Sequence, residues 1–189
     1  MIRALLALAV LATPAAADRD QPPKKDRARL GKTTNTAALP AVGRKPEKLV
    51  NLRNQWTDEW LAIAPGEQVP PATADRFLRD HYTSEHIAME PALLGFVLAA
   101  ADHFRSDTAF VVSAFRHPKY NLILRKKGHQ VARDSQHTHG TAVDFFLPRV
   151  TTKALHAWAK TRRAGGVGLY LDSGFIHMDT GPVRYWNGE

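Results

Sequence analysis

The chain has 189 residues, of which 44% are hydrophobic and 23% charged, and it contains no cysteine. This composition excludes a collagen, a coiled coil and a wholly disordered chain. The lack of cysteine excludes thiol catalysis, cysteine-ligated zinc and iron–sulfur clusters. The formal charge is +8, but residues 18–50 hold nine Lys or Arg against four Asp or Glu. Much of the basic excess therefore lies near the N-terminus, and a uniformly basic surface for nucleic acid is not expected.

The first 17 residues have the features of an export signal. Arg3 precedes an apolar run over residues 4–12, and the three alanines at 15–17 suit a cleavage site. The apolar run is too short to span a bilayer, and no later segment is apolar enough to do so. We therefore predict a Sec-type signal peptide over residues 1–17 and a periplasmic or secreted protein.

The segment that follows is basic and rich in proline. Residues 18–48 combine Pro, Lys, Arg and small polar residues without apolar periodicity, which predicts a flexible linker. Such a segment serves either as a solvated spacer or as a weak contact with anionic wall polymer or lipid headgroups. Both interpretations fit the sequence.

The pattern changes to that of a folded domain over residues 49–189. The stretch 49–63 predicts two short strands with a turn between them. Thr73 is expected to cap a short helix. A longer helix is expected from Pro91 to Phe104, because proline suits the first helical position and the apolar residues that follow share one face.

The second half of the domain alternates buried strands with one helix. Residues 109–115 and 142–147 are rich in β-branched and aromatic residues, which predicts buried strands. A helix is expected to begin at Thr151 or Thr152. Because the elements lack regular βαβ units, we predict an α+β fold with a small antiparallel sheet and flanking helices. The two closing strands are expected at 166–170 and 175–180.

The first unusual polar cluster lies where a loop enters the strand at 142–147. His137 and His139 belong to the loop, and Asp144 interrupts a strand that is apolar on both faces. A buried carboxylate is costly unless it is paired or bound to a cation. His137 is placed to share that cation.

The second cluster lies in the last predicted strand, where His177 and Asp179 share a face. Two histidines and one aspartate, namely His137, Asp144 and His177, suit Zn²⁺ with a fourth position open to water, which is the catalytic pattern. The alternative is a structural Asp–His pair next to an unrelated pair on a strand.

The motif S-x-H-x-x-G-x-A-x-D at 135–144 resembles the first zinc motif of the murein D,D-peptidases, the family of zinc D-Ala-D-Ala carboxypeptidases and VanX-type dipeptidases. The similarity covers about residues 49–189 and is greatest to the murein endopeptidase K branch, through the blocks FLRDHYT, SAFRHPKYN, GGVGLY and FIHMDTGPVRYW. This resemblance implies a small α+β fold with an antiparallel sheet. It also implies one zinc ion per chain, bound by His137, Asp144 and His177, and cleavage of peptide cross-links in peptidoglycan.

The resemblance also suggests roles for residues around the metal. Arg116 matches the arginine that these enzymes place near the substrate, and a guanidinium suits a stem-peptide carboxylate. Tyr170 or His139 would help to orient the substrate or stabilise the oxyanion. The acidic residue that other members carry before the last zinc histidine is not present here, so Asp179 is our candidate general base, followed by His139 and Asp172. As a base, Asp179 replaced by Asn should keep the zinc and lose turnover.

Together these features predict a zinc-dependent murein endopeptidase that hydrolyses peptide cross-links through a metal-activated water. Two alternatives remain open: a zinc D,D-carboxypeptidase that trims terminal D-amino acids, and a peptidoglycan-binding module without turnover. Both D,D and L,D cross-links fit the sequence as substrates.

Overall fold

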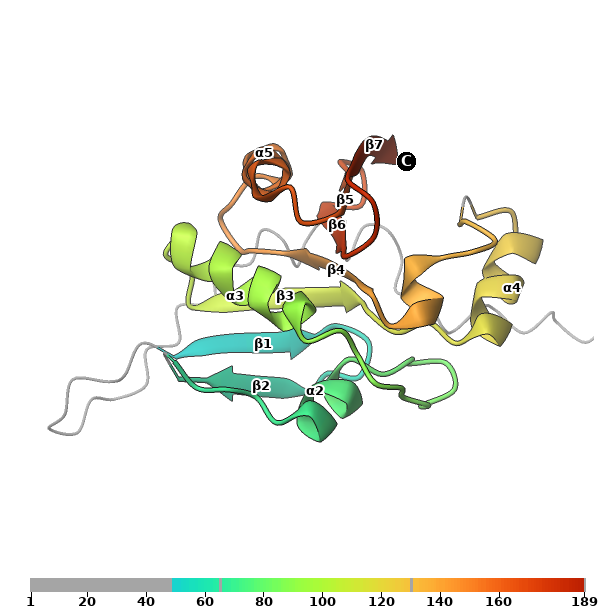
Figure 1. Ribbon diagram of the computed structural model, residues 1–189, viewed down its shortest axis with the longest axis horizontal. Helices are drawn as coiled ribbons and strands as arrows, with labels where there is room; N and C mark the ends of the chain where they lie inside the picture. Colours follow the sequence, from blue (N-terminus) through green and yellow to red (C-terminus); the bar gives the residue numbers. More distant parts are fainter. Residues whose placement is uncertain (1–48, 65, 130, 189) are drawn as a thin grey trace, which may run out of the picture.

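The computed structural model describes residues 49–64, 66–129 and 131–188, so the predicted signal peptide and linker lie outside the described residues. Its centre is a seven-stranded sheet with helices packed around it (Figure 1). Across the sheet the strands follow the order β2-β1-β3-β4-β6-β5-β7. The strands are β1 (Val50–Asn54), β2 (Trp60–Ile63), β3 (Thr108–Ser113), β4 (Ala142–Phe146), β5 (Gly166–Tyr170), β6 (Phe175–Asp179) and β7 (Arg184–Gly188). The helices are α2 (Pro71–Phe77), α3 (Ala92–His103), α4 (Pro118–Lys126), α5 (Thr152–Arg162) and the short 3-10 helix η1 (Gln136–His139).

The predicted α+β class is confirmed, but the sheet is mixed rather than antiparallel. Strands β1 and β3 run parallel, as do β5 and β7, while the other neighbouring pairs are antiparallel. Parallel neighbours need a long connection between them. The chain between β1 and β3 supplies one by passing through β2, α2 and α3, and β7 returns past β6 to the outer edge of β5.

Most predicted elements are present, with differences at their ends. Helix α2 begins at Pro71 with Pro70 as its N-cap, so Thr73 lies in the first turn and does not cap the helix. Proline suits the first helical position because its missing N–H needs no partner there. Helix α4 and strand β7 were not predicted. Helix α4 also has a proline, Pro118, at its start, and its N-cap His117 accepts a hydrogen bond from a backbone N–H of the first turn. Within the described residues, no helix is long and apolar enough to cross a membrane.

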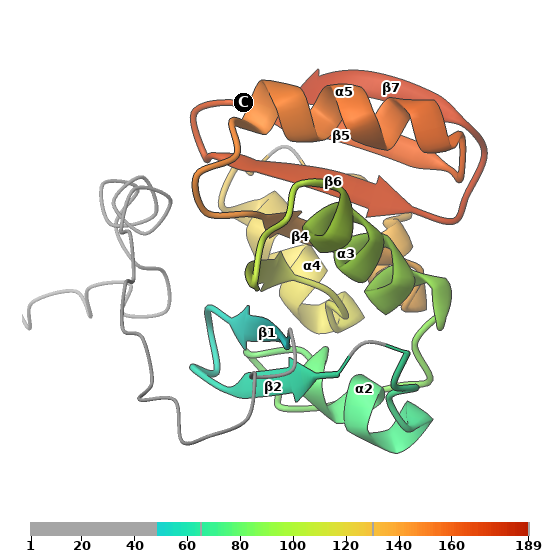
Figure 2. The same ribbon diagram turned by 90° about the vertical axis from the view of Figure 1, so that its left-hand side faces the viewer.

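The two faces of the sheet have different roles. Helix α3 lies against β3, β4 and β6, and α5 lies against β5 and β6 (Figure 2). The side chains of Val143, Phe145 and Ile176 point into this main core. On the opposite face a smaller cluster contains Phe146 and Phe175. Because side chains alternate along a strand, the residues between the core positions of β4 and β6 must face away from α3 and α5.

Candidate active site

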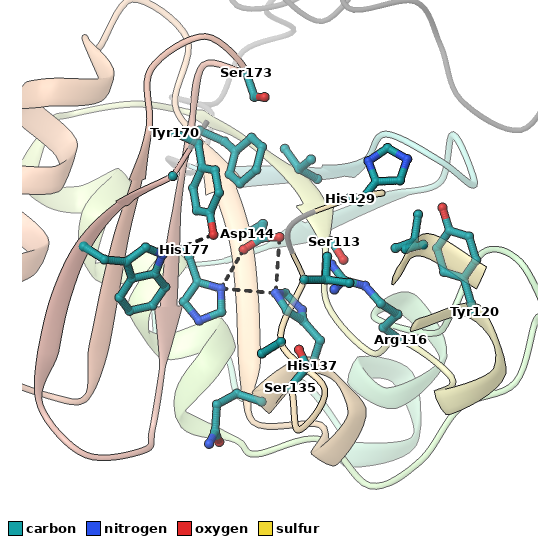
Figure 3. A pocket seen from close by; sticks show the side chains of 18 of the residues that line it. Ser113, Arg116, Tyr120, His129, Ser135, His137, Asp144, Tyr170, Ser173 and His177 are labelled. Atoms are coloured by element: carbon teal, nitrogen blue, oxygen red, sulfur yellow. Dashed lines mark hydrogen bonds and ion pairs between the residues drawn. The ribbon is translucent and has the colours of Figure 1, made fainter. Parts of the chain in front are cut away.

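Three potential metal ligands meet on the face of the sheet away from α3 and α5. The register of β4 and β6 places Asp144 opposite His177, and His137 reaches them from η1. His137 Nε2 lies 3.2 Å from Asp144 Oδ2 and 3.1 Å from His177 Nδ1, which lies 2.8 Å from Asp144 Oδ1 (Figure 3). All three side chains are buried. They form a group that can hold one metal ion.

The donor set and its spacing fit zinc. At Zn–N and Zn–O distances near 2.0–2.2 Å, neighbouring ligands of a tetrahedral ion lie about 3.3 Å apart. The two histidine nitrogens lie 3.1 Å apart, and each lies 2.8–3.2 Å from one of the two Asp144 oxygens, so this spacing is close to what the ion requires. Two imidazoles and one carboxylate leave a fourth position, as catalytic zinc sites do.

Hydrogen bonds behind the two imidazoles decide which nitrogen would face a metal ion. His137 Nδ1 lies 2.7 Å from the carbonyl oxygen of Ala114, which can only accept, so Nδ1 carries the hydrogen and the Nε2 lone pair is free. His177 Nε2 lies 2.8 Å from Asp179 Oδ2 and donates to it. His177 therefore presents Nδ1, and both rings are oriented before a metal arrives.

The electrostatics of His137, Asp144 and His177, called the trio from here on, also favour a bound cation. Burial alone would raise the pKa of Asp144, but the neighbouring imidazoles of His137 and His177 outweigh it and hold that pKa well below its usual range. Burial lowers the pKa of His137. Burial also opposes a charge on His177, but hydrogen bonds with Asp144 and Asp179 prevail and raise its pKa. Of the three groups, His177 is therefore the one whose protonated form the surroundings favour.

Asp179 lies behind His177 and does not line the cavity. Its fully buried carboxylate accepts hydrogen bonds from the backbone N–H groups of Gly166 and Gly181, both at 2.9 Å. It also accepts from the guanidinium of Arg184 at 2.7 and 3.1 Å. Burial would raise the pKa of Asp179, yet His177, Arg184 and the backbone of Gly166 lower it below its usual range. In this position the carboxylate is an anionic anchor for the His177 ring.

Glycines in β5 let side chains of β7 reach the site, which the sequence analysis missed. Gly166 and Gly168 pair with Arg184 and Trp186. A Cβ atom on Gly168 would lie 2.6 Å from the Trp186 ring, and one on Gly166 would lie 2.5 Å from the Arg184 guanidinium. The centroids of the Trp186 and His177 rings are 5.1 Å apart. Glycines two residues apart in a strand often indicate that another group approaches the backbone closely. The sequence of β5 therefore contained a signal for these neighbours.

A cavity of about 650 Å³ opens in front of the trio. Arg116 and Tyr170 line it and flank the trio (Figure 3). The backbone N–H of Arg116 donates to the carbonyl oxygen of His137 at 3.0 Å, which ties the Arg116 segment to η1. The structure therefore brings both predicted substrate-binding residues to the predicted metal ligands.

His139 is not brought to the trio. Its ring is exposed, its Nε2 lies 2.6 Å from Asp134 Oδ1, and it does not line the cavity. A 3-10 helix has three residues per turn, so residues two apart in η1 point in different directions. Because His137 points inward, His139 points outward.

Comparisons with known proteins show the family of this chain. A family model described as peptidoglycan L,D-endopeptidase MepK (Peptidase_M15_2) matches residues 49–186. The chain is 34% identical over 159 residues to the probable peptidoglycan L,D-endopeptidase MepK of Haemophilus influenzae, covering 80% of this chain and 86% of that protein. It is 33% identical over 117 residues to the peptidoglycan L,D-endopeptidase MepK of Escherichia coli K12, covering 61% and 64%. No solved structure matches significantly. The predicted resemblance is confirmed: the chain belongs to the Peptidase_M15_2 family of MepK-type peptidoglycan peptidases.

Proposed function

We propose that this protein is an exported, zinc-dependent endopeptidase that hydrolyses L,D peptide cross-links in peptidoglycan. The observation that carries the proposal is the buried trio of His137, Asp144 and His177, whose ligand atoms lie close together and which lines a large cavity. Family membership supports the reaction class. The names of the two relatives support the L,D cross-link over the D,D cross-link.

The residues around the trio have separable roles in this proposal. His137, Asp144 and His177 would hold one zinc ion per chain, which polarises an amide carbonyl and makes a water more acidic when bound. Arg116 offers a guanidinium to a carboxylate of the stem peptide. Asp179 and His139 stay predictions for the general base, although neither lines the cavity.

The location of the substrate supports the N-terminal predictions. Peptidoglycan lies outside the cytoplasmic membrane, so an enzyme that cuts it must be exported. We propose that residues 1–17 direct this export. Residues 18–48 would then act as a spacer or hold the enzyme weakly to anionic wall polymer or lipid.

Digestion of purified muropeptides tests the proposed reaction. The zinc-loaded protein is expected to convert L,D-cross-linked dimers into monomers and to leave D,D-cross-linked dimers largely uncut, as mass spectrometry of the products would show. Loss of one terminal residue from monomers would instead identify a carboxypeptidase. Unchanged muropeptides, with retained binding to sacculi, would identify a binding module.

Zinc affinity should depend on pH through His177. Below its raised pKa, His177 holds a proton that must leave before Nδ1 can bind the ion. We therefore expect zinc affinity to fall about tenfold per pH unit below that pKa and to level off above it, with about one proton released per ion on the acid side. Calorimetric titration in two buffers of different ionisation enthalpy measures both quantities. An affinity that does not change between about pH 5 and 8 would contradict this expectation.

A further inference from the structure

The Tyr170 side chain is held in one position by three neighbours. Its ring stacks on Phe175, with centroids 4.7 Å apart and planes 18° from parallel. On the neighbouring strand it faces Gly188, where a Cβ atom would lie 2.1 Å from the Tyr170 ring. Its hydroxyl oxygen accepts a hydrogen bond from Trp186 Nε1 at 3.2 Å. A side chain fixed in this way is oriented before a substrate binds.

The bond from Trp186 determines what the Tyr170 hydroxyl can do. An indole N–H can only donate, so the Tyr170 oxygen is the acceptor and its own hydrogen must point elsewhere. Within the described part of the chain, this hydroxyl makes no other hydrogen bond. Burial raises the pKa of Tyr170, so the group keeps its hydrogen at neutral pH. Accepting from Trp186 also makes the hydroxyl a stronger donor.

The Tyr170 hydroxyl points toward the proposed metal ligands. Tyr170 lines the cavity, and its hydroxyl is directed toward Asp144 and His177 (Figure 3). Trp186 is a neighbour of both Tyr170 and His177. Its N–H donates to the Tyr170 hydroxyl, and its ring centroid lies 5.1 Å from that of His177. A substrate carbonyl that enters the open side of the trio therefore comes next to this donor.

We propose that Tyr170 is a catalytic residue, whose hydroxyl donates a hydrogen bond to the oxyanion that forms on the scissile carbonyl and whose direction is set by Trp186. This inference rests on the proposed function. In hydrolysis the water oxygen adds to the carbonyl carbon and the π electron pair moves onto the carbonyl oxygen. Collapse then breaks the C–N bond, and the proton that the attacking water gives up passes to the leaving amine. Tyr170 stabilises the negative oxygen throughout and transfers no proton itself.

The test compares Tyr170→Phe with Tyr185→Phe. Tyr185 is an exposed tyrosine of β7 whose hydroxyl donates to the carbonyl oxygen of Lys160, so its variant controls for loss of a phenol. Tyr170→Phe is expected to lower kcat about 10²–10³-fold with little change in KM. Zinc content and melting temperature should match the wild type. Trp186→Phe keeps an aromatic ring but removes the N–H, and we expect a smaller loss of about 3–10-fold.

A readout other than turnover separates a donor from a structural residue. A phosphinate pseudopeptide has a tetrahedral, negatively charged centre like the oxyanion, whereas the cleaved product does not. Calorimetry should show that Tyr170→Phe weakens phosphinate binding by about the factor lost in kcat and leaves product binding unchanged. Full activity of Tyr170→Phe, or lost activity with unchanged phosphinate affinity, would overturn the inference. A wild-type protein that cuts no cross-linked muropeptide would instead overturn the proposed function.

Discussion

Replacement of His177 by Ala is expected to reduce zinc content from about one ion per chain to near zero and to abolish cross-link cleavage. Two ligands remain in that variant, and zinc sites of the catalytic type need three from the protein. The fold should also lose about 3–5 kcal/mol, because Asp144 and Asp179 are buried and each loses its hydrogen bond to this ring. Elemental analysis and thermal unfolding of the purified variant measure the two effects.

The matched control for this variant is His86→Ala, which removes an exposed histidine from a loop that does not line the cavity. It should keep its zinc, its melting temperature and its turnover. His139→Ala is informative in the same series, because that ring is exposed and pairs with Asp134. If His177→Ala retains stoichiometric zinc, then the assignment of His177 as a ligand is wrong.

Strand alternation was enough to predict which face carries the proposed metal ligands. Each of Asp144 and His177 lies between core residues, such as Val143, Phe145 and Ile176, that are fully buried against the helices. A shift by one residue in either strand would turn these apolar side chains outward, so one register satisfies both strands. The sequence pattern and the packed structure therefore agree on this part of the site.

The position of Asp179 relative to His177 could not be predicted in the same way. Residues two apart in a strand share a face about 7 Å from each other. That spacing allows Asp179 either to face the cavity beside the proposed metal site or to contact the His177 imidazole from behind. Hydrogen-bond partners on other strands decide between these two orientations of Asp179. The Gly166 N–H and the Arg184 guanidinium donate to its carboxylate and hold it away from the cavity.

Those partners depend on a strand pairing that local sequence does not reveal. Strand β7 joins the sheet by pairing in parallel with β5, across a connection that includes all of β6. Short-range patterns predict hairpins well, but they carry little information about parallel neighbours. The contributions of Arg184 and Trp186 to the site could therefore be identified only from the structure. The glycines that pair with them, in contrast, can be read from the sequence.

Replacement of Asp179 by Asn distinguishes an anchor for His177 from a general base. The carboxylate of Asp179 is surrounded by donors alone: the His177 ring, two backbone N–H groups and the Arg184 guanidinium. An asparagine must turn its NH₂ group toward some of these donors, which leaves buried hydrogen-bonding groups without acceptors. We therefore expect a lower melting temperature and a 10–100-fold loss of zinc affinity, as for other groups that orient a metal-bound histidine.

Turnover measured at two zinc concentrations decides between the two roles. For an anchor, activity of Asp179→Asn should be low at limiting zinc and should return to within about tenfold of wild type when zinc saturates the site. For a general base, zinc affinity should stay near wild type while kcat falls about 10²–10⁴-fold at every zinc concentration. Asp58→Asn is the control, because it alters an aspartate whose side chain is 71% exposed and paired with Arg53. We expect the result for an anchor. The Asp179 carboxylate is fully buried and accepts a hydrogen bond from His177, so it has no access to the attacking water.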